Sequence, residues 1–164
     1  MPAPVTTHPV EAYLHEHIPI SRAMGIRVVE ATLDGVTLSA PLEPNVNHRS
    51  TVFGGSCASV AILAAWTLVH LRVQAAGIDG RVVIQRGATE YRLPIQGTFV
   101  ATCASPGDPT WDRFIRALGR RGQARVELEV VVTSEDSVVA SFSGAYVAIA
   151  GQPDGHGPRL GVDG

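Results

Sequence analysis

The sequence predicts an α+β fold in which one long, buried central helix packs on a strongly bent antiparallel β-sheet of five to six strands. At 164 residues, the chain is long enough for one domain with a substantial core. Residues 50–71 carry no formal charge, which is typical of a helix that is buried on all sides. Several other segments alternate apolar and polar residues, as half-buried strands do.

The elements follow in an order of two strands, one helix and four strands. Asp34-Gly35 is a strong hairpin signal between two alternating segments. The long helix is expected from Gly54 to Ala76, because Gly77 and Asp79-Gly80 then end it. The expected strands are 26–33, 36–42, 81–93, 98–105, 124–132 and 137–149, and a short helix interrupted near Pro19 is expected over 11–22.

An insertion at residues 109–121 has the pattern of an amphipathic helix. Its apolar positions follow i, i+3, i+4, i+7 spacing and are Trp111, Phe114, Ile115 and Leu118. Its basic positions are Arg113, Arg116, Arg120 and Arg121. Crowded arginines repel one another unless carboxylates or an anionic ligand balance them, and guanidinium groups bind phosphates well. Two readings stay open: a site for an anionic ligand, in which Arg116 and Arg120 bind, or a solvated helix face.

Composition narrows the class of protein. The formal net charge of −2 gives no reason to expect nucleic acid or an anionic membrane as partner. Cys57 and Cys103 have no CxxC spacing, and the N-terminus lacks the order of a signal peptide, so we expect a cytoplasmic protein. We expect residues 1–9 and 151–164 to be flexible and residues 10–150 to form the domain.

The uncharged segment raises a second possibility, because it is long enough to span a bilayer. It is single and central, it begins with Gly54-Gly55-Ser56, and Arg49 and Arg72 flank it. These features favour a helix inside a globular core. Such a helix needs a cover beyond its own sheet, so we expect a homodimer or a higher homo-oligomer.

The residues from Asn45 to Ser56 resemble a known family. Together with residues 114–118 (Phe-Ile-Arg-Ala-Leu) and 125–130 (Arg-Val-Glu-Leu-Glu-Val), they are similar to the thioesterase family of the YiiD C-terminal type, over about residues 18–149. The resemblance implies a hot-dog fold, usually dimeric, that acts on acyl groups carried as thioesters on coenzyme A or an acyl-carrier protein. It implies no cofactor, since coenzyme A is part of the substrate. The anionic ligand of Arg116 and Arg120 would then be the nucleotide end of coenzyme A or an acidic carrier-protein surface.

Thioester hydrolysis develops negative charge on the carbonyl oxygen, and the N–H groups at a helix N-terminus can stabilise it. We expect Gly55 to be the principal donor, with Gly54 or Ser56 as helper, because glycine permits close approach to the backbone. The alternative is that the glycines only allow tight packing of the helix.

Asn47 is the second catalytic candidate. Similar phenylacetyl-CoA thioesterases carry an Asn six residues before the His of a His-Gly-Gly motif, and Asn47 lies six before Phe53. An amide can accept from and donate to a water, although it can equally stabilise its own turn. Phe53 replaces the motif's His, and Ile62 stands where those relatives have a helix carboxylate.

The general base must therefore come from elsewhere. His48 has a suitable intrinsic pKa, and Glu90 is an alternative that a partner subunit could supply. Cys57 in the first helical turn could be a stabilised thiolate, but a buried cysteine is more often a small apolar residue. The histidines show no metal spacing, and no metal is expected.

The sequence thus predicts an acyl-thioester hydrolase. The alternatives are a hot-dog hydratase or dehydratase of acyl thioesters, and a non-catalytic module that binds acyl-CoA or an acyl carrier.

Overall fold

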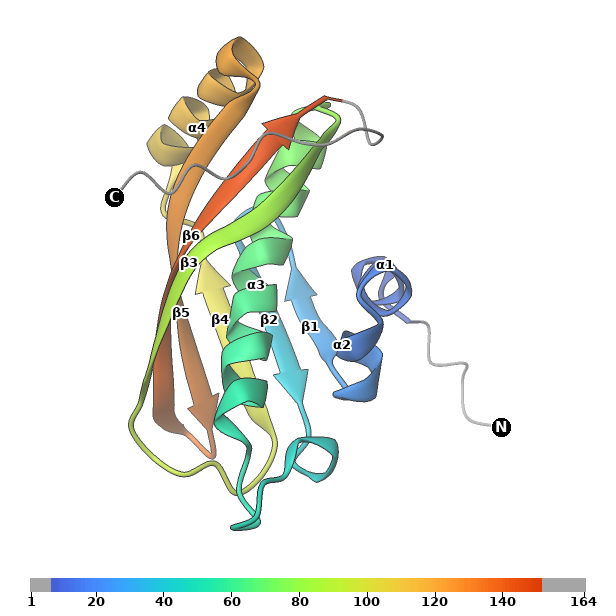
Figure 1. The fold of residues 1–164 in the computed structure, drawn as a ribbon, viewed down its shortest axis with the longest axis vertical. Coiled ribbons are helices and arrows are strands. Elements are labelled where there is room, and N and C mark those ends of the chain that lie inside the picture. Colours follow the sequence, from blue (N-terminus) through green and yellow to red (C-terminus); the bar gives the residue numbers. More distant parts are fainter. Residues whose placement is uncertain (1–6, 152–164) are drawn as a thin grey trace.

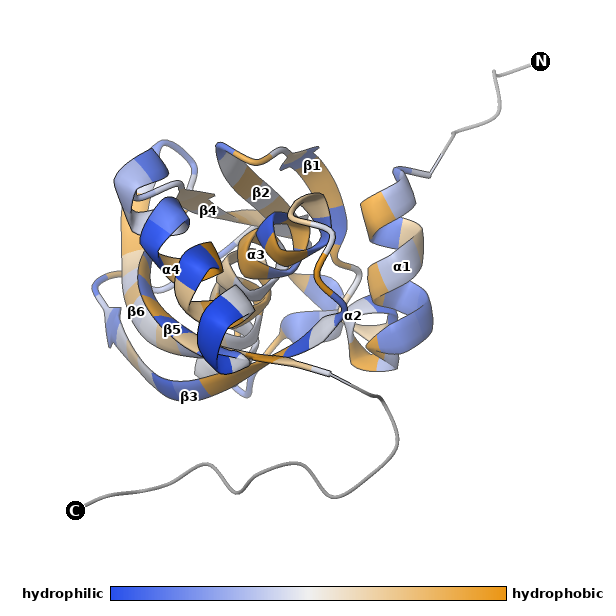
Figure 2. Ribbon diagram, turned by 90° about the horizontal axis from the view of Figure 1, so that it is seen from above, coloured by the Kyte–Doolittle hydropathy of each residue, from blue (hydrophilic) through white to orange (hydrophobic). Residues whose placement is uncertain are grey.

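The computed structural model describes residues 7–151 and confirms the predicted fold class. The elements are α1 (Pro9–His17), α2 (Pro19–Ala23), β1 (Arg27–Ala31), β2 (Gly35–Ala40), η1 (Glu43–Asn45), α3 (Gly54–Ala75), β3 (Gly80–Tyr91), β4 (Phe99–Ala104), α4 (Asp108–Arg121), β5 (Gln123–Ser134) and β6 (Ser137–Ala150). All strand pairs are antiparallel, in the order β1-β2-β4-β5-β6-β3. The sheet curves around α3 but stays open, with β1 and β3 as its edges (Figures 1 and 2).

Helix α3 forms the centre of the core. By length and composition it could cross a membrane, yet 56% of its most apolar window is buried inside the fold. Its sheet-facing residues include Val60, Ala64 and Leu68, each with no exposed surface. Burying this apolar surface against the sheet supplies a driving force of roughly 25 cal/mol per Å².

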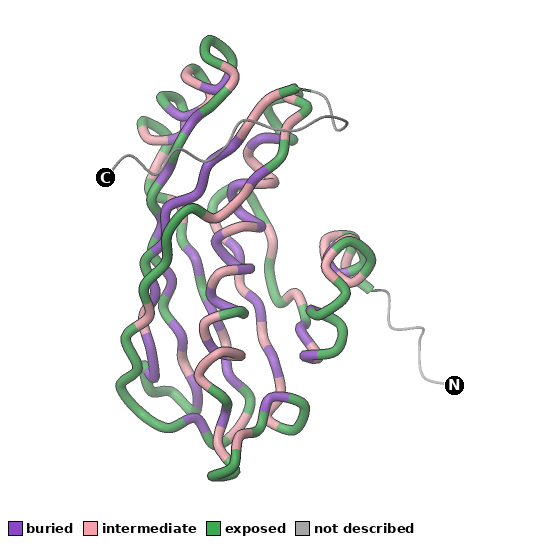
Figure 3. The backbone as a smooth tube through the Cα atoms, in the orientation of Figure 1, coloured by how far each residue is buried: buried purple, intermediate pink, exposed green. Residues whose placement is uncertain are grey.

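The opposite face of α3 is less buried than the sequence predicts (Figure 3). Ile62, Trp66 and His70 follow one another at intervals of four and remain partly exposed. Helix α1 covers only the upper part of this stripe, where the Tyr13 ring lies 4.9 Å from the His70 ring and Trp66 stacks on the other side of His70 at 4.8 Å. Within one chain, α3 is therefore buried on its sheet side and half-buried on the other.

Helix α1 begins at Pro9, inside the stretch that was expected to be flexible. Its first turn is capped by His8, whose Nδ1 accepts from the Val10 N–H at 3.1 Å. Residues 1–6 and 152–164, to which the remaining terminal predictions refer, lie outside the described residues.

The insertion forms α4, as predicted. Trp111, Phe114 and Leu118 are buried, and Gly122 ends the helix in a left-handed conformation with φ 72°. β4 pairs with β5 only at Val131–Thr133, so α4 packs beside the part of β5 that β4 leaves free. It stands at the end of the molecule where α3 finishes (Figure 1).

Candidate active site

Two backbone donors are unused at the start of α3. The N–H groups of Gly54 and Gly55 have no hydrogen-bond partner among residues 7–151. The next N–H, from Ser56, already donates to the Phe53 carbonyl at 2.9 Å. Gly54 is therefore the available helper to Gly55, and the Ser56 N–H is not.

The surrounding backbone fixes this helix start. Phe53 N–H donates to the Asn45 carbonyl at 2.7 Å, and Val52 N–H donates to the Ile95 carbonyl at 2.8 Å. The Tyr91 hydroxyl, at the end of β3, donates to the Gly54 carbonyl at 2.8 Å. The two unused donors thus belong to a rigid segment, which is what electrostatic stabilisation of a developing charge requires.

A cavity of about 350 Å³ opens at the start of α3, where Gly54 is one of its lining residues and Gly55 is the next residue along the chain. Its lining is mainly apolar and comprises Thr51, Val52, Gly54, Cys57, Tyr91, Arg92, Leu93, Pro94 and Ile95. Phe53 lies over Gly55, because a Cβ built at Gly55 would be 2.3 Å from a Phe53 ring carbon. Any larger residue at position 55 would require the Phe53 ring, which is largely exposed, to move.

Asn47 is fully engaged by its own loop. Its Nδ2 donates to Thr51 Oγ1 at 3.0 Å and to the Val52 carbonyl at 3.3 Å. Its Oδ1 accepts from the Arg49 N–H at 2.8 Å and the Thr51 N–H at 3.3 Å. Both amide donors are therefore used, and the geometry corresponds to the turn-stabilising alternative. Direct water binding by Asn47 would require the loop to rearrange.

His48 lies at the exposed tip of this loop, which a bridge between Val46 and Val52 closes. Among the described residues, no hydrogen bond or ion pair holds its ring. The imidazole is therefore free to reorient toward a bound molecule.

Glu90 faces away from the helix start in its own chain, because of a bulge in β3. The register shifts between Ile84 and Arg86, so residues after the bulge change sides. Arg86 then bonds Glu127 on the outer face at 3.3 Å, whereas Tyr91 points inward to Gly54. By alternation Glu90 lies on the outer face, which removes it as the base for a site in the same chain.

Cys57 lines the cavity but is a poor nucleophile. Burial raises the pKa of its thiol to about 11. The helix N-terminus would favour a thiolate, but desolvation is the larger effect here. The stabilised-thiolate alternative is therefore wrong, and Cys57 is a small apolar residue of the core. Within residues 7–151, no three His, Cys, Asp or Glu side chains gather as a metal site would require.

The structure separates Arg116 and Arg120 from the glycines. Both are exposed on α4, which packs near the far end of α3 (Figure 1). A helix of 22 residues is about 33 Å long at 1.5 Å per residue. One protomer does not unite these arginines with Gly55 in a compact site, and their role in binding stays a prediction.

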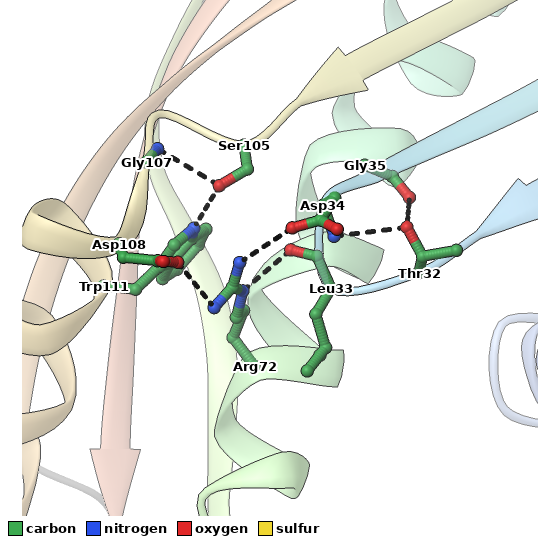
Figure 4. Close-up of polar contacts among 9 residues, drawn as sticks. All are labelled: Thr32, Leu33, Asp34, Gly35, Arg72, Ser105, Gly107, Asp108 and Trp111. Atoms are coloured by element: carbon green, nitrogen blue, oxygen red, sulfur yellow. Dashed lines mark hydrogen bonds and ion pairs between the residues drawn. The ribbon is translucent and has the colours of Figure 1, made fainter.

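Arg72, which the sequence analysis used only as a flank of the helix, organises the other end of α3 (Figure 4). Its Nε donates to the Leu33 carbonyl at 2.8 Å, and its guanidinium lies 5.2 Å from the Trp111 ring centroid. Asp34 and Asp108 lie 3.8 and 3.9 Å away. These contacts join α3 to the β1–β2 turn and to α4.

The curved sheet, the central helix and its glycine start define a hot-dog protein of thioesterase type. The chain belongs to the family described as "Putative thioesterase (yiiD_Cterm)", whose model matches residues 7–150.

Solved structures agree with this assignment. A protein of unknown function from Chlorobaculum tepidum is 31% identical with a TM-score of 0.79, over 84% of this chain and 90% of that one. A "putative thioesterase" from Shewanella oneidensis is 29% identical with a TM-score of 0.74, over 84% and 93%. A protein from Pseudomonas aeruginosa, described as a "probable thioesterase", shares the fold at 22% identity and a TM-score of 0.76, over 88% and 98%.

Proposed function

We propose that this protein hydrolyses acyl thioesters, with the substrate carbonyl oxygen bound by the N–H groups of Gly55 and Gly54. The observation that carries this proposal is the pair of unused donors at the positive end of a 22-residue helix, beside an apolar cavity. A helix N-terminus stabilises an anion through its unpaired N–H groups and its dipole together. The apolar lining accommodates the start of an acyl chain.

Water is the nucleophile in this proposal, and His48 is the base that accepts its proton. The raised pKa of the Cys57 thiol argues against covalent catalysis. Asn47 acts through the loop that carries His48, since its amide bonds Thr51, Val52 and Arg49. The tetrahedral intermediate then collapses, the C–S bond breaks, and the expelled thiolate takes the proton from His48.

The acyl carrier is coenzyme A or an acyl-carrier protein, and the reaction takes place in the cytoplasm. Both cysteines are unpaired, which is consistent with a reducing compartment.

The active form is a homodimer or larger. Two features support this: the half-buried stripe on α3 and the outer edge of β3, which has no strand partner among the described residues. Analytical ultracentrifugation tests it, because a stable monomer of 17.3 kDa at micromolar concentration would contradict the assembly.

The proposed reaction is tested by incubating the protein with a panel of acyl-CoAs and acyl carriers and a thiol-detecting dye. Release of free thiol supports hydrolysis. An altered acyl group without thiol would instead indicate a hydratase. Saturable binding with neither change would indicate a binding module, which the apolar Ile62 at the expected carboxylate position favours among the alternatives.

A further inference from the structure

A second cavity, of about 830 Å³, lies between α4 and β5. This volume is within the range of small-molecule sites. Its lining comprises Pro106, Thr110, Arg113, Phe114, Ala117, Arg121, Gln123, Ala124, Arg125, Val126 and Glu127. It is an open groove whose lining combines arginines with apolar residues.

The groove carries a surplus of positive charge. Three of its lining residues are arginines and only Glu127 is acidic. Glu127 is already bonded to Arg125 at 2.8 Å and to Arg86, outside the groove, at 3.3 Å. Arg113 and Arg121 form no ion pair among the described residues. A ligand that enters this groove would therefore meet two uncompensated guanidinium groups.

The structure divides the arginines of α4 between two faces. Arg113, Ala117 and Arg121 recur at intervals of four, so they lie on one side of the helix, and all three line the groove. Arg116 lines a different cavity, which it shares with Arg72 and Trp111. The arginines that the sequence presents as one group are thus separated, and only Arg113 and Arg121 line the groove beside β5.

The strand offers backbone donors as well. β5 pairs with β4 only at Val131–Thr133, so its α4 side has no strand partner from Gln123 to Val130 in the described structure. Alternate N–H groups along such an edge point sideways into the space between strand and helix. The apolar surface in the groove comes mainly from Pro106, which is exposed, and Ala117, which is partly exposed, because Phe114 and Val126 are almost completely buried.

We propose that this groove binds a nucleoside diphosphate group, either free or as the nucleotide end of coenzyme A. The phosphates lie between Arg113 and Arg121, with Arg125 fixed beside them by its bond to Gln85 at 2.9 Å. The ring system lies against the apolar surface of Pro106 and Ala117.

This site stands apart from the acyl site. No residue of α3 lines the groove. Arg72, the α3 residue that contacts α4 at Trp111, is eighteen residues from Gly54, or about 27 Å along the helix axis. The inference therefore holds whether or not the protein hydrolyses thioesters.

Calorimetric titration of the full chain tests the proposal with four probes: ADP, pyrophosphate, adenosine and coenzyme A. We expect ADP to bind more tightly than pyrophosphate, because its adenine ring adds apolar contacts to those of the phosphates. We expect adenosine to bind most weakly, because it has no phosphate for the arginines. ADP affinity should fall as ionic strength rises, since exposed charges are screened within about 10 Å at 0.1 M. If coenzyme A competes with ADP, the groove binds the nucleoside diphosphate group both free and as part of coenzyme A. If it does not compete, the groove binds only the free nucleotide.

Two double variants of α4 locate the site, because they remove the same charge from residues that line the groove and from residues that do not. Arg113→Ala with Arg121→Ala should weaken ADP binding roughly tenfold or more, the scale of lost charge-assisted hydrogen bonds. Arg116→Ala with Arg120→Ala should change it less than about twofold, since those side chains lie outside the groove. Lysine at positions 113 and 121 should restore binding only partly, because an ammonium lacks the two-pronged geometry.

Three results would overturn the proposal. These are no ADP binding to the unmodified protein, equal weakening by both double variants, and loss of binding only with the Arg116 and Arg120 pair. Should the Arg113 and Arg121 variant fail to fold, hydrogen exchange on the unmodified protein decides: ADP should protect residues 106–127, and protection elsewhere contradicts the site.

Discussion

The two ends of α3 are built in opposite ways. At its C-terminal end Arg72 bonds the Leu33 carbonyl at 2.8 Å and packs on Trp111, so the helix is tied to two other elements. At its N-terminal end no side chain caps the helix, and the N–H groups of Gly54 and Gly55 are unused within the described structure. Helix ends normally satisfy such groups with caps. The open end is therefore the one available to a ligand, and the closed end serves the fold.

This difference predicts that stability and activity separate along a single helix. Changes at the glycine end should lower turnover and leave the fold intact. Changes at the arginine end should lower stability and leave the turnover of folded molecules intact.

The largest expected effect is that of Gly55→Ala. The new methyl group would lie 2.3 Å from a Phe53 ring carbon, so the ring must move. We expect the displaced ring to cover the approach to the two N–H groups. We expect kcat/KM to fall by roughly 10²-fold, the scale for losing an oxyanion contact, with little change in Tm. Steady-state kinetics and a thermal melt measure the two quantities.

A double variant provides the control for this change. Phe53→Ala removes the ring, so the Gly55→Ala and Phe53→Ala pair should recover much of the lost activity. The comparison is a double-mutant cycle of Gly55→Ala, Phe53→Ala and the two together. If the activity losses of the two single variants simply add in the double variant, the Phe53 ring and residue 55 do not act through their contact.

Arg72→Ala should have the next largest effect, on stability. It removes a charge-assisted hydrogen bond and a cation–π contact from a side chain that is only 14% exposed. We expect a loss of about 2 kcal/mol, or a decrease in Tm of roughly 4–8 °C for a chain of this size. Arg116→Ala, an exposed arginine nearby on α4, should change Tm little; equal losses for both variants would contradict a specific role for Arg72.

A smaller effect concerns pH and the covered part of α3. Burial, and then the charge of His17, lower the pKa of His70. The unfolded chain therefore binds a proton more readily than the folded one, and stability should decrease as pH falls below about 6.5. Denaturant melts from pH 7.5 to 5.5 should show this slope, and His70→Gln should flatten it. Glu11, whose pKa is lowered from 4.5, contributes only at more acid pH.

Cys57→Ala should have the smallest effect on turnover. The thiol lines the cavity, but its pKa of about 11 keeps it protonated near neutrality. We expect the kcat of Cys57→Ala to be within about twofold of that of the unmodified protein. In the unmodified protein, we expect the Cys57 thiol to be alkylated slowly at pH 8. Complete loss of turnover would instead indicate covalent catalysis.

The sequence was sufficient for the fold because local patterns and tertiary packing agree. The uncharged run and its glycine boundaries predicted α3 to within one residue, and the i, i+3, i+4, i+7 spacing predicted α4. Burial on the second face of α3 was not predictable, because it depends on how far Tyr13 and the rest of α1 reach across the helix.

The candidate site was only partly predictable, for two physical reasons. A one-residue bulge near Gln85 changes the side on which Glu90 lies, and nothing in the alternation of apolar residues marks it. The Asn47 amide has several possible partners, and only the folded loop shows that it bonds Thr51 and Val52. Arg72 could have been suspected, since it is the cation nearest the end of an otherwise uncharged helix.

The most direct test of the open helix end is Gly54→Pro. Proline is well tolerated at the first position of a helix, and the preceding residue, Phe53, already has the extended backbone that proline requires, with φ −59° and ψ 131°. The change therefore removes one N–H at little cost to the fold. We predict that the unmodified protein releases free thiol from acyl thioesters and that Gly54→Pro slows this by about 10²-fold at unchanged Tm. Thiol release by Gly54→Pro at the unmodified rate would contradict the account.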